Sequence, residues 1–166
     1  MSLAGDIKES IKTTAPDIYA DSRWEKIADG IASAFGYEDA WTSFAPSWTN
    51  LTVGSGTNTG YYKQIGKTVF MRVYLKFAAD TSVSGDIYLE FPIPIKTHDG
   101  ITYIGGARLR DANVATSYQA MFQNNRGFTA FNSSGTYSVA TSINATVPFT
   151  WATNDEIEVQ CIYEAE

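Results

Sequence analysis

Hydrophobic and polar residues alternate along most of this chain from Thr49 onward. The clearest stretch is Lys67–Ala78. One of its faces would carry Val69, Met71, Val73, Leu75 and Phe77, and the other Phe70, Arg72, Tyr74 and Lys76. A period of two residues is typical of a β-strand with one face in a core and the other wet or against a neighbour. The pattern therefore predicts a strand over this stretch.

Eight more stretches show a similar pattern and are separated by turn residues. The predicted strands are Thr49–Val53, Tyr61–Ile65, Lys67–Ala78, Asp86–Phe91, Ile101–Leu109, Ser117–Gln123, Gly127–Asn132, Tyr137–Val147 and Glu156–Tyr163. Short strands at this spacing, with no helical pattern between them, indicate an antiparallel β-sandwich that is jelly-roll-like. The glycine-rich stretch Gly54–Gly60 is interpreted as a flexible loop, because it lacks the Gly-Lys-Ser/Thr ending of a phosphate-binding loop.

The first forty residues follow a helical pattern instead. Ser22 and Glu25 form a capping box at a helix start, and Gly36 is a plausible C-terminal stop. Between them, apolar residues recur at helical spacing, among them Trp24, Ile27, Ile31 and Phe35. We therefore divide the chain into a short helical arm at residues 1–40 and a β-sandwich at residues 41–166. The arm either covers one end of the sandwich or docks on another subunit, and both readings remain open.

Several predicted strands carry large apolar residues on both faces. A sandwich has one wet face per sheet, so surplus aromatic residues on an outer face need a further partner. A homo-oligomer is the simplest explanation. The candidates for oligomer-interface or core residues are Trp41, Trp48, Phe70, Tyr74 and Trp151.

Composition narrows the classes of binding partner that we expect. The formal net charge is −6 over 166 residues, and the basic residues are scattered. Nucleic acids and anionic membranes both need a cluster of basic residues, so we expect neither as a partner. Cys161 is the only cysteine and should be an inert core residue. No membrane span or secretory signal is evident, which indicates synthesis in a cytoplasm.

The residue pattern offers no workable set of catalytic groups. The only histidine, His98, lies in a predicted hairpin turn. Five carboxylates (Asp80, Asp86, Glu90, Asp99 and Asp111) are interpreted as solvated surface charge. Aromatic residues that could hold a sugar ring, such as Tyr61 and Tyr103, are better explained by packing. We expect neither enzymatic activity, nor a metal ion, nor a cofactor.

The order of several motifs carries a resemblance. The stretches Trp41–Gly54 and Gly60–Val69 are followed much later by Val147–Ile157 and by Tyr163-Glu164. This order resembles the β-sandwich module of structural proteins of tailed bacteriophages, with its "W…P-x-W/L-T", "G-x-Y-x-x-x-G-K-x-V" and "P-F-x-W-A-x-x-D" motifs. The resemblance covers about three-quarters of the chain. Gly60 and Gly66 would allow tight turns, and Asp155 would shape the turn into the last strand.

Members of that group resemble short fibre heads and surface-decoration proteins, which are commonly trimers. The resemblance therefore implies a virion structural protein, a homotrimeric capsid decoration protein or short head fibre on the virion surface. Its arm, with Trp24, Ile27, Ile31 and Phe35, would dock on the major capsid protein or another virion component. An alternative is a tail fibre or receptor-binding protein that recognises host surface glycan. A glycan hydrolase is a third class, and it would need two carboxylates about 5–10 Å apart in a cleft.

Overall fold

The computed structural model describes residues 26–27, 29–31, 40–96, 100–134 and 137–166, and the described part of the chain is mainly antiparallel β-structure. The strands are β1 (Thr42–Phe44), β2 (Trp48–Thr52), β3 (Thr57–Ile65), β4 (Thr68–Lys76), β5 (Ser82–Leu89), β6 (Tyr103–Asp111), β7 (Thr116–Gln123), β8 (Phe128–Ser134), β9 (Tyr137–Ser142) and β10 (Glu156–Glu164). Each of the nine predicted strands overlaps one of them. The prediction of a mainly β, antiparallel fold is confirmed.

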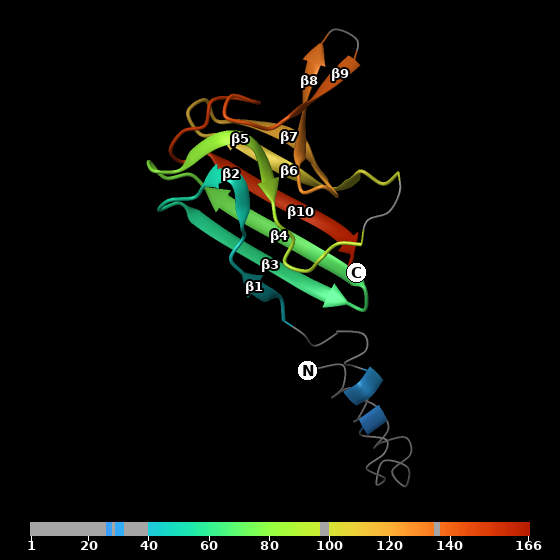
Figure 1. Cartoon of the computed structure of the whole chain (residues 1–166). Coiled ribbons are helices and arrows are strands. Elements are labelled where there is room, and N and C mark those ends of the chain that lie inside the picture. The colour runs from blue at the N-terminus through green and yellow to red at the C-terminus, as the bar shows by residue number, and fades with distance from the viewer. Residues whose placement is uncertain (1–25, 28, 32–39, 97–99, 135–136) are drawn as a thin grey trace.

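Two layers of very different size form the fold. The large sheet has the order β1-β3-β4-β10-β6-β7-β8-β9, and the second layer holds only β2 and β5. In Figure 1 the β2–β5 pair crosses one face of the large sheet, and the β8–β9 hairpin extends beyond its edge. The last strand, β10, lies in the middle of the sheet between β4 and β6. The fold is therefore sandwich-like, with one small layer over one face of a large sheet.

The core lies between the two layers. The apolar face predicted for Lys67–Ala78, the stretch that contains β4, is buried as expected. Its residues Val69, Met71, Val73 and Leu75 are all at most 4% exposed. Alternate residues of β10 join them, including Ile157 and Val159, and Ile87 and Leu89 of β5 cover them from the second layer. Cys161 is buried in this core, as predicted.

The strands of the structure differ locally from the predicted ones. The strand β1 was not predicted, because three residues are too few to show a period. The stretch Gly54–Gly60 was interpreted as a loop, yet its second half, from Thr57, belongs to β3. The predicted strand Tyr137–Val147 ends at Ser142.

The two glycines expected to allow tight turns serve different purposes. Gly66 has a φ of 59° in the turn between β3 and β4, as expected. Gly60 instead lies inside β3, paired with Val73 of β4 and Phe44 of β1. A Cβ atom at Gly60 would lie 2.5 Å from the Phe44 ring, so a glycine is needed here to seat that ring.

Of the predicted N-terminal helix, the structure describes Lys26, Ile27 and Asp29–Ile31, and these residues are helical. Ile27 and Ile31 are 46% and 42% exposed. Trp24, Phe35 and His98 lie outside the described residues.

Candidate functional site

The outer face of the large sheet, opposite the β2–β5 layer, is the candidate functional surface. Strand register arranges its side chains in rows that run across the strands. One row contains Phe70 and Ile162, and the next contains Tyr61, Arg72 and Gln160. The two following rows contain Tyr74 with Glu158 and Arg108, and Lys76 with Glu156 and Arg110. The first two rows have no acidic residue, whereas the last two are rich in charge.

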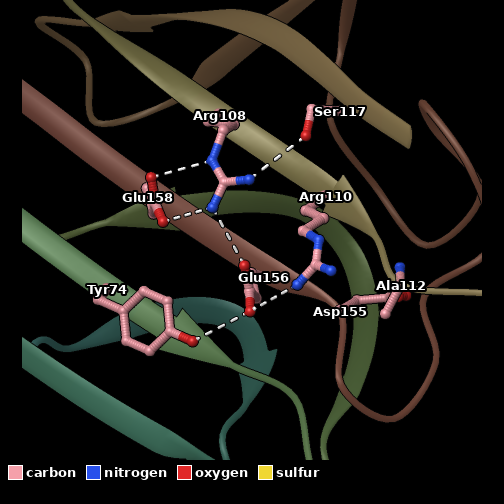
Figure 2. A network of polar contacts seen from close by, with 8 residues as sticks. All are labelled: Tyr74, Arg108, Arg110, Ala112, Ser117, Asp155, Glu156 and Glu158. Atoms are coloured by element: carbon pink, nitrogen blue, oxygen red, sulfur yellow. Dashed lines mark hydrogen bonds and ion pairs between the residues drawn. The ribbon is translucent and has the colours of Figure 1, made fainter. Parts of the chain in front are cut away.

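The charged rows form a connected network, which we call the polar half (Figure 2). Arg108 donates to two carboxylates of β10, with Nη2 at 2.5 Å from Glu158 Oε1 and 3.1 Å from Glu156 Oε2. The other Glu156 oxygen accepts from Arg110 Nη1 at 3.1 Å and from the Tyr74 hydroxyl at 3.3 Å. The Glu156 side chain is only 12% exposed, so its carboxylate is largely shielded from water. Its three hydrogen-bond partners stabilise the negative charge there.

The same contacts shift the proton affinities of the network. The hydrogen bonds from Arg108 hold the pKa of Glu158 below its ordinary value, and those bonds also raise the pKa of Arg108. Burial, and then the negative charge of Glu156, raises the pKa of Tyr74. The two arginines and the two glutamates of the polar half are therefore paired with one another within the chain.

The first two rows and their neighbours form the second region, the apolar half-face. We define it by Trp41, Tyr61, Phe70, Arg72, Ile104, Gln160 and Ile162. A hollow of about 430 Å³ lies among these residues, lined by all of them except Tyr61. Ile162, at its centre, is 55% exposed. Within the described part of the chain, nothing covers this surface.

Arg72 is the one charged residue in the centre of the apolar half-face. Its guanidinium carbon lies 4.2 Å from the centre of the Trp41 ring and 5.6 Å from the centre of the Tyr61 ring. This cation–π contact fixes the side chain against two exposed aromatic rings. Among the residues that the structure describes, no carboxylate forms an ion pair with Arg72.

Two adjacent glycines of β6 shape this surface. A Cβ atom at Gly105 would lie 2.2 Å from the carbonyl oxygen of Gln160, so β6 and β10 approach too closely for any other residue. Gly106 has no such neighbour and is in register with Gln160. It leaves a position without a side chain on the outer face beside the hollow.

The predicted interface or core residues fall into three places. Trp48 and Trp151 pack against the core, where Trp151 stacks on Phe77 at 4.8 Å and donates to the carbonyl of Asn144. Tyr74 belongs to the polar half, and Trp41 and Phe70 belong to the apolar half-face. The sequence analysis missed Arg72, Ile104 and Ile162 as members of that surface. The alternation indicates which face of its strand each residue occupies, but only the pairing register of the strands shows that these residues lie side by side.

Three of the five carboxylates considered for catalysis, Asp80, Glu90 and Asp111, have structural partners. Asp80 accepts from the backbone and hydroxyl of Ser55, which lowers its pKa, and Glu90 pairs with Arg126. Asp155, which is fully buried, accepts from the backbone of Ala112 at 2.8 Å and of Ala152 at 2.6 Å, so its predicted role in the last turn is confirmed. Asp99 lies outside the described residues.

The described residues contain no group of three or more His, Cys, Asp or Glu side chains that could hold a metal ion. Burial raises the pKa of the Cys161 thiol to about 12, so this thiol stays protonated and unreactive at neutral pH.

Comparison of this chain with protein-family models, with curated proteins and with solved structures finds no match. Within the described residues, no helix is long and apolar enough to cross a membrane.

Proposed function

We propose that this chain is a structural protein of a bacteriophage virion, a homotrimeric capsid decoration protein or short head fibre that is attached through its N-terminal segment. It catalyses no reaction and acts by contact. The jelly-roll-like topology, which the spacing of the strands predicted, belongs to the same proposal. The site of action is the virion surface, with the major capsid protein or another virion component as the partner.

The observation that carries this proposal is the uncovered apolar half-face. Trp, Tyr and Arg are the residues most enriched at the energetic centres of protein interfaces, and Trp41, Tyr61 and Arg72 stand together here. Aliphatic and aromatic side chains, among them Phe70 and Ile162, surround the hollow beside them. Such a surface favours burial against protein, since exposed apolar patches mark interaction sites.

Two measurements test this proposal. Antibodies against the purified chain should label intact virions in immunogold electron microscopy, at the head surface. A chain lacking residues 1–35 should keep its β-sheet circular dichroism and its cooperative unfolding but fail to bind particles. Absence of the chain from purified virions would contradict the assignment.

A second candidate function is recognition of host surface glycan by a tail fibre. A hollow of about 240 Å³ beside the first one is lined by Tyr61, Tyr74, Glu158, Gln160, Thr59 and Arg72, among others. Aromatic faces beside acid and amide groups are what a sugar ring needs. A glycan array separates the two functions. Binding that is lost in Tyr61→Ala would favour recognition, and an array without signal would favour decoration.

A further inference from the structure

We propose that the apolar half-face is the docking site for residues 22–36 of a neighbouring copy of this chain, so that exchanged N-terminal segments hold the trimer together. The inference rests on the proposed function, because it names the contact that builds the proposed trimer. It chooses the second of the two roles that the sequence left open for the arm: it assigns Ile27 and Ile31 to the contact between copies and leaves attachment to the particle to residues 1–21.

The first argument is that two apolar surfaces are both unburied in the single chain. Ile27 and Ile31 are nearly half exposed, and so is Ile162 on the half-face. Large apolar side chains are stabilised by leaving water, at roughly 25 cal/mol per Å² of buried surface. A contact between the two surfaces in a neighbouring copy buries both at once.

Dimensions agree with this contact. A helix over residues 24–35, as the sequence predicts, would be about 17 Å long at ~1.5 Å per residue. The half-face runs from Trp41, beside β1, across β3, β4 and β10 to Ile104 in β6. Four strand spacings of ~4.8 Å make this width about 19 Å. The apolar residues of the segment thus match the apolar row in length.

Charge is complementary as well. Residues 1–40 contain eight of the eighteen acidic residues but only four of the twelve basic ones, so they carry four of the six net negative charges. The first two rows of the outer face contain Lys63 and Arg72 and no acid. Within the described residues, neither cation has a carboxylate partner. An acidic segment on this surface supplies one.

The chain reaches from one copy to the next. From Ile31 to Phe35 the predicted helix adds about 6 Å at ~1.5 Å per residue, and the six steps from Phe35 to Trp41 add at most about 21 Å. This reach of about 27 Å is close to twice the radius of gyration of a domain of this size, which is about 14 Å, so the segment can contact an adjacent sandwich. The contact joins two different surfaces and is therefore heterologous. A contact of this kind forms a ring when the rotation between copies closes, and three copies related by about 120° would form the proposed trimer.

Cross-linking of the full-length chain tests the inference. One preparation carries Ile31→Cys and another carries Ile162→Cys, and the two are mixed, allowed to exchange subunits and oxidised. We expect a disulfide-linked dimer on a non-reducing gel. The matched controls are Lys26→Cys and Gln119→Cys, and pairs that include either one should give little product. Both replace exposed polar residues; Lys26 belongs to the docking segment but lies on the face of the predicted helix opposite Ile27 and Ile31, and Gln119 lies outside the half-face. Oxidation of each single variant on its own shows how much cross-linked product forms through Cys161.

A second readout is oligomeric mass by light scattering. Ile31→Glu and Ile162→Glu should each raise the trimer dissociation constant by at least about 30-fold, the effect of losing one central interface contact. Lys26→Glu and Gln119→Glu should change it less than about 3-fold. Because all four residues are exposed, circular dichroism should show the same folded sandwich in every variant.

The outcomes separate the two proposals. A trimer that gives no 31–162 cross-link and survives Ile31→Glu would overturn the docked segment and leave the trimeric virion protein standing. A wild-type chain that is monomeric would overturn the trimer and the docked segment together. A 31–162 bond formed inside one chain would also overturn the exchange between copies.

Discussion

The outer face of the large sheet has two halves made from the same four strands, β3, β4, β10 and β6. In the polar half, Glu156 and Glu158 are held by Arg108, Arg110 and Tyr74 of neighbouring strands (Figure 2). In the apolar half-face, Arg72 lies against two aromatic rings and has no carboxylate partner among the described residues. One half forms its ion pairs within a single chain. The other leaves Arg72 and Ile162 exposed, so under the proposed trimer the first half should stabilise the fold and the second should drive association.

The largest expected effect concerns the glycine pair beneath the half-face. Gly105→Ala places a methyl group against the backbone of Gln160 and must push β6 away from β10, at a cost of about 3 kcal/mol in the free energy of unfolding. Gly106→Ala is the matched control and should cost less than about 1 kcal/mol, because nothing but one carbonyl 3.9 Å away is near. Chemical denaturation measures both. Equal losses would mean that strand spacing does not shape this surface.

A smaller effect should distinguish the halves directly. Glu156→Ala removes the acceptor of two guanidinium groups and one hydroxyl in a partly buried setting, and should cost about 2 kcal/mol in the free energy of unfolding. Ile162→Ala, on the exposed apolar half-face, should cost less than about 0.5 kcal/mol in the dissociated chain. These losses are measured by urea denaturation at low protein concentration. The reverse order would contradict the division of roles.

The smallest effect is a dependence on pH. The pKa of Glu158 is lower in the folded chain than its ordinary value, so its ion pair stabilises the fold above the ordinary pKa, and this stabilisation is lost as the pH falls through the folded value. Its side chain is 43% exposed, so screening limits the contribution to less than about 1 kcal/mol. Glu158→Gln should therefore be less stable than the wild type at pH 7, and this difference should shrink as the pH falls through the folded pKa of Glu158. Denaturation midpoints over a series of acidic pH values test this, and a difference that does not change with pH would exclude the ion pair as its cause.

The two halves also differ in how well the sequence predicted them. Alternation in Lys67–Ala78 placed Phe70, Arg72, Tyr74 and Lys76 on one face, because side-chain direction follows directly from strand geometry. It did not show that Glu156 lies beside Tyr74, since that depends on pairing between strands that are far apart in the sequence.

The apolar half-face was harder still to predict. Trp41 and Phe70 were expected at an interface or in the core, but the contact of Trp41 with Arg72 requires the pairing of β1, β3 and β4. The same limit applies to Gly60. It was expected in a turn, because a glycine that makes room for a ring of another strand looks no different in sequence from a turn glycine.

The most direct test of the account is the mass of the full-length chain at micromolar concentration, by light scattering coupled to size-exclusion chromatography. The account predicts three times the 18.2 kDa of one chain for the wild type and for Gln119→Glu, and a shift toward the single chain for Ile162→Glu. A wild-type protein that elutes as a clean 18.2 kDa monomer would contradict it.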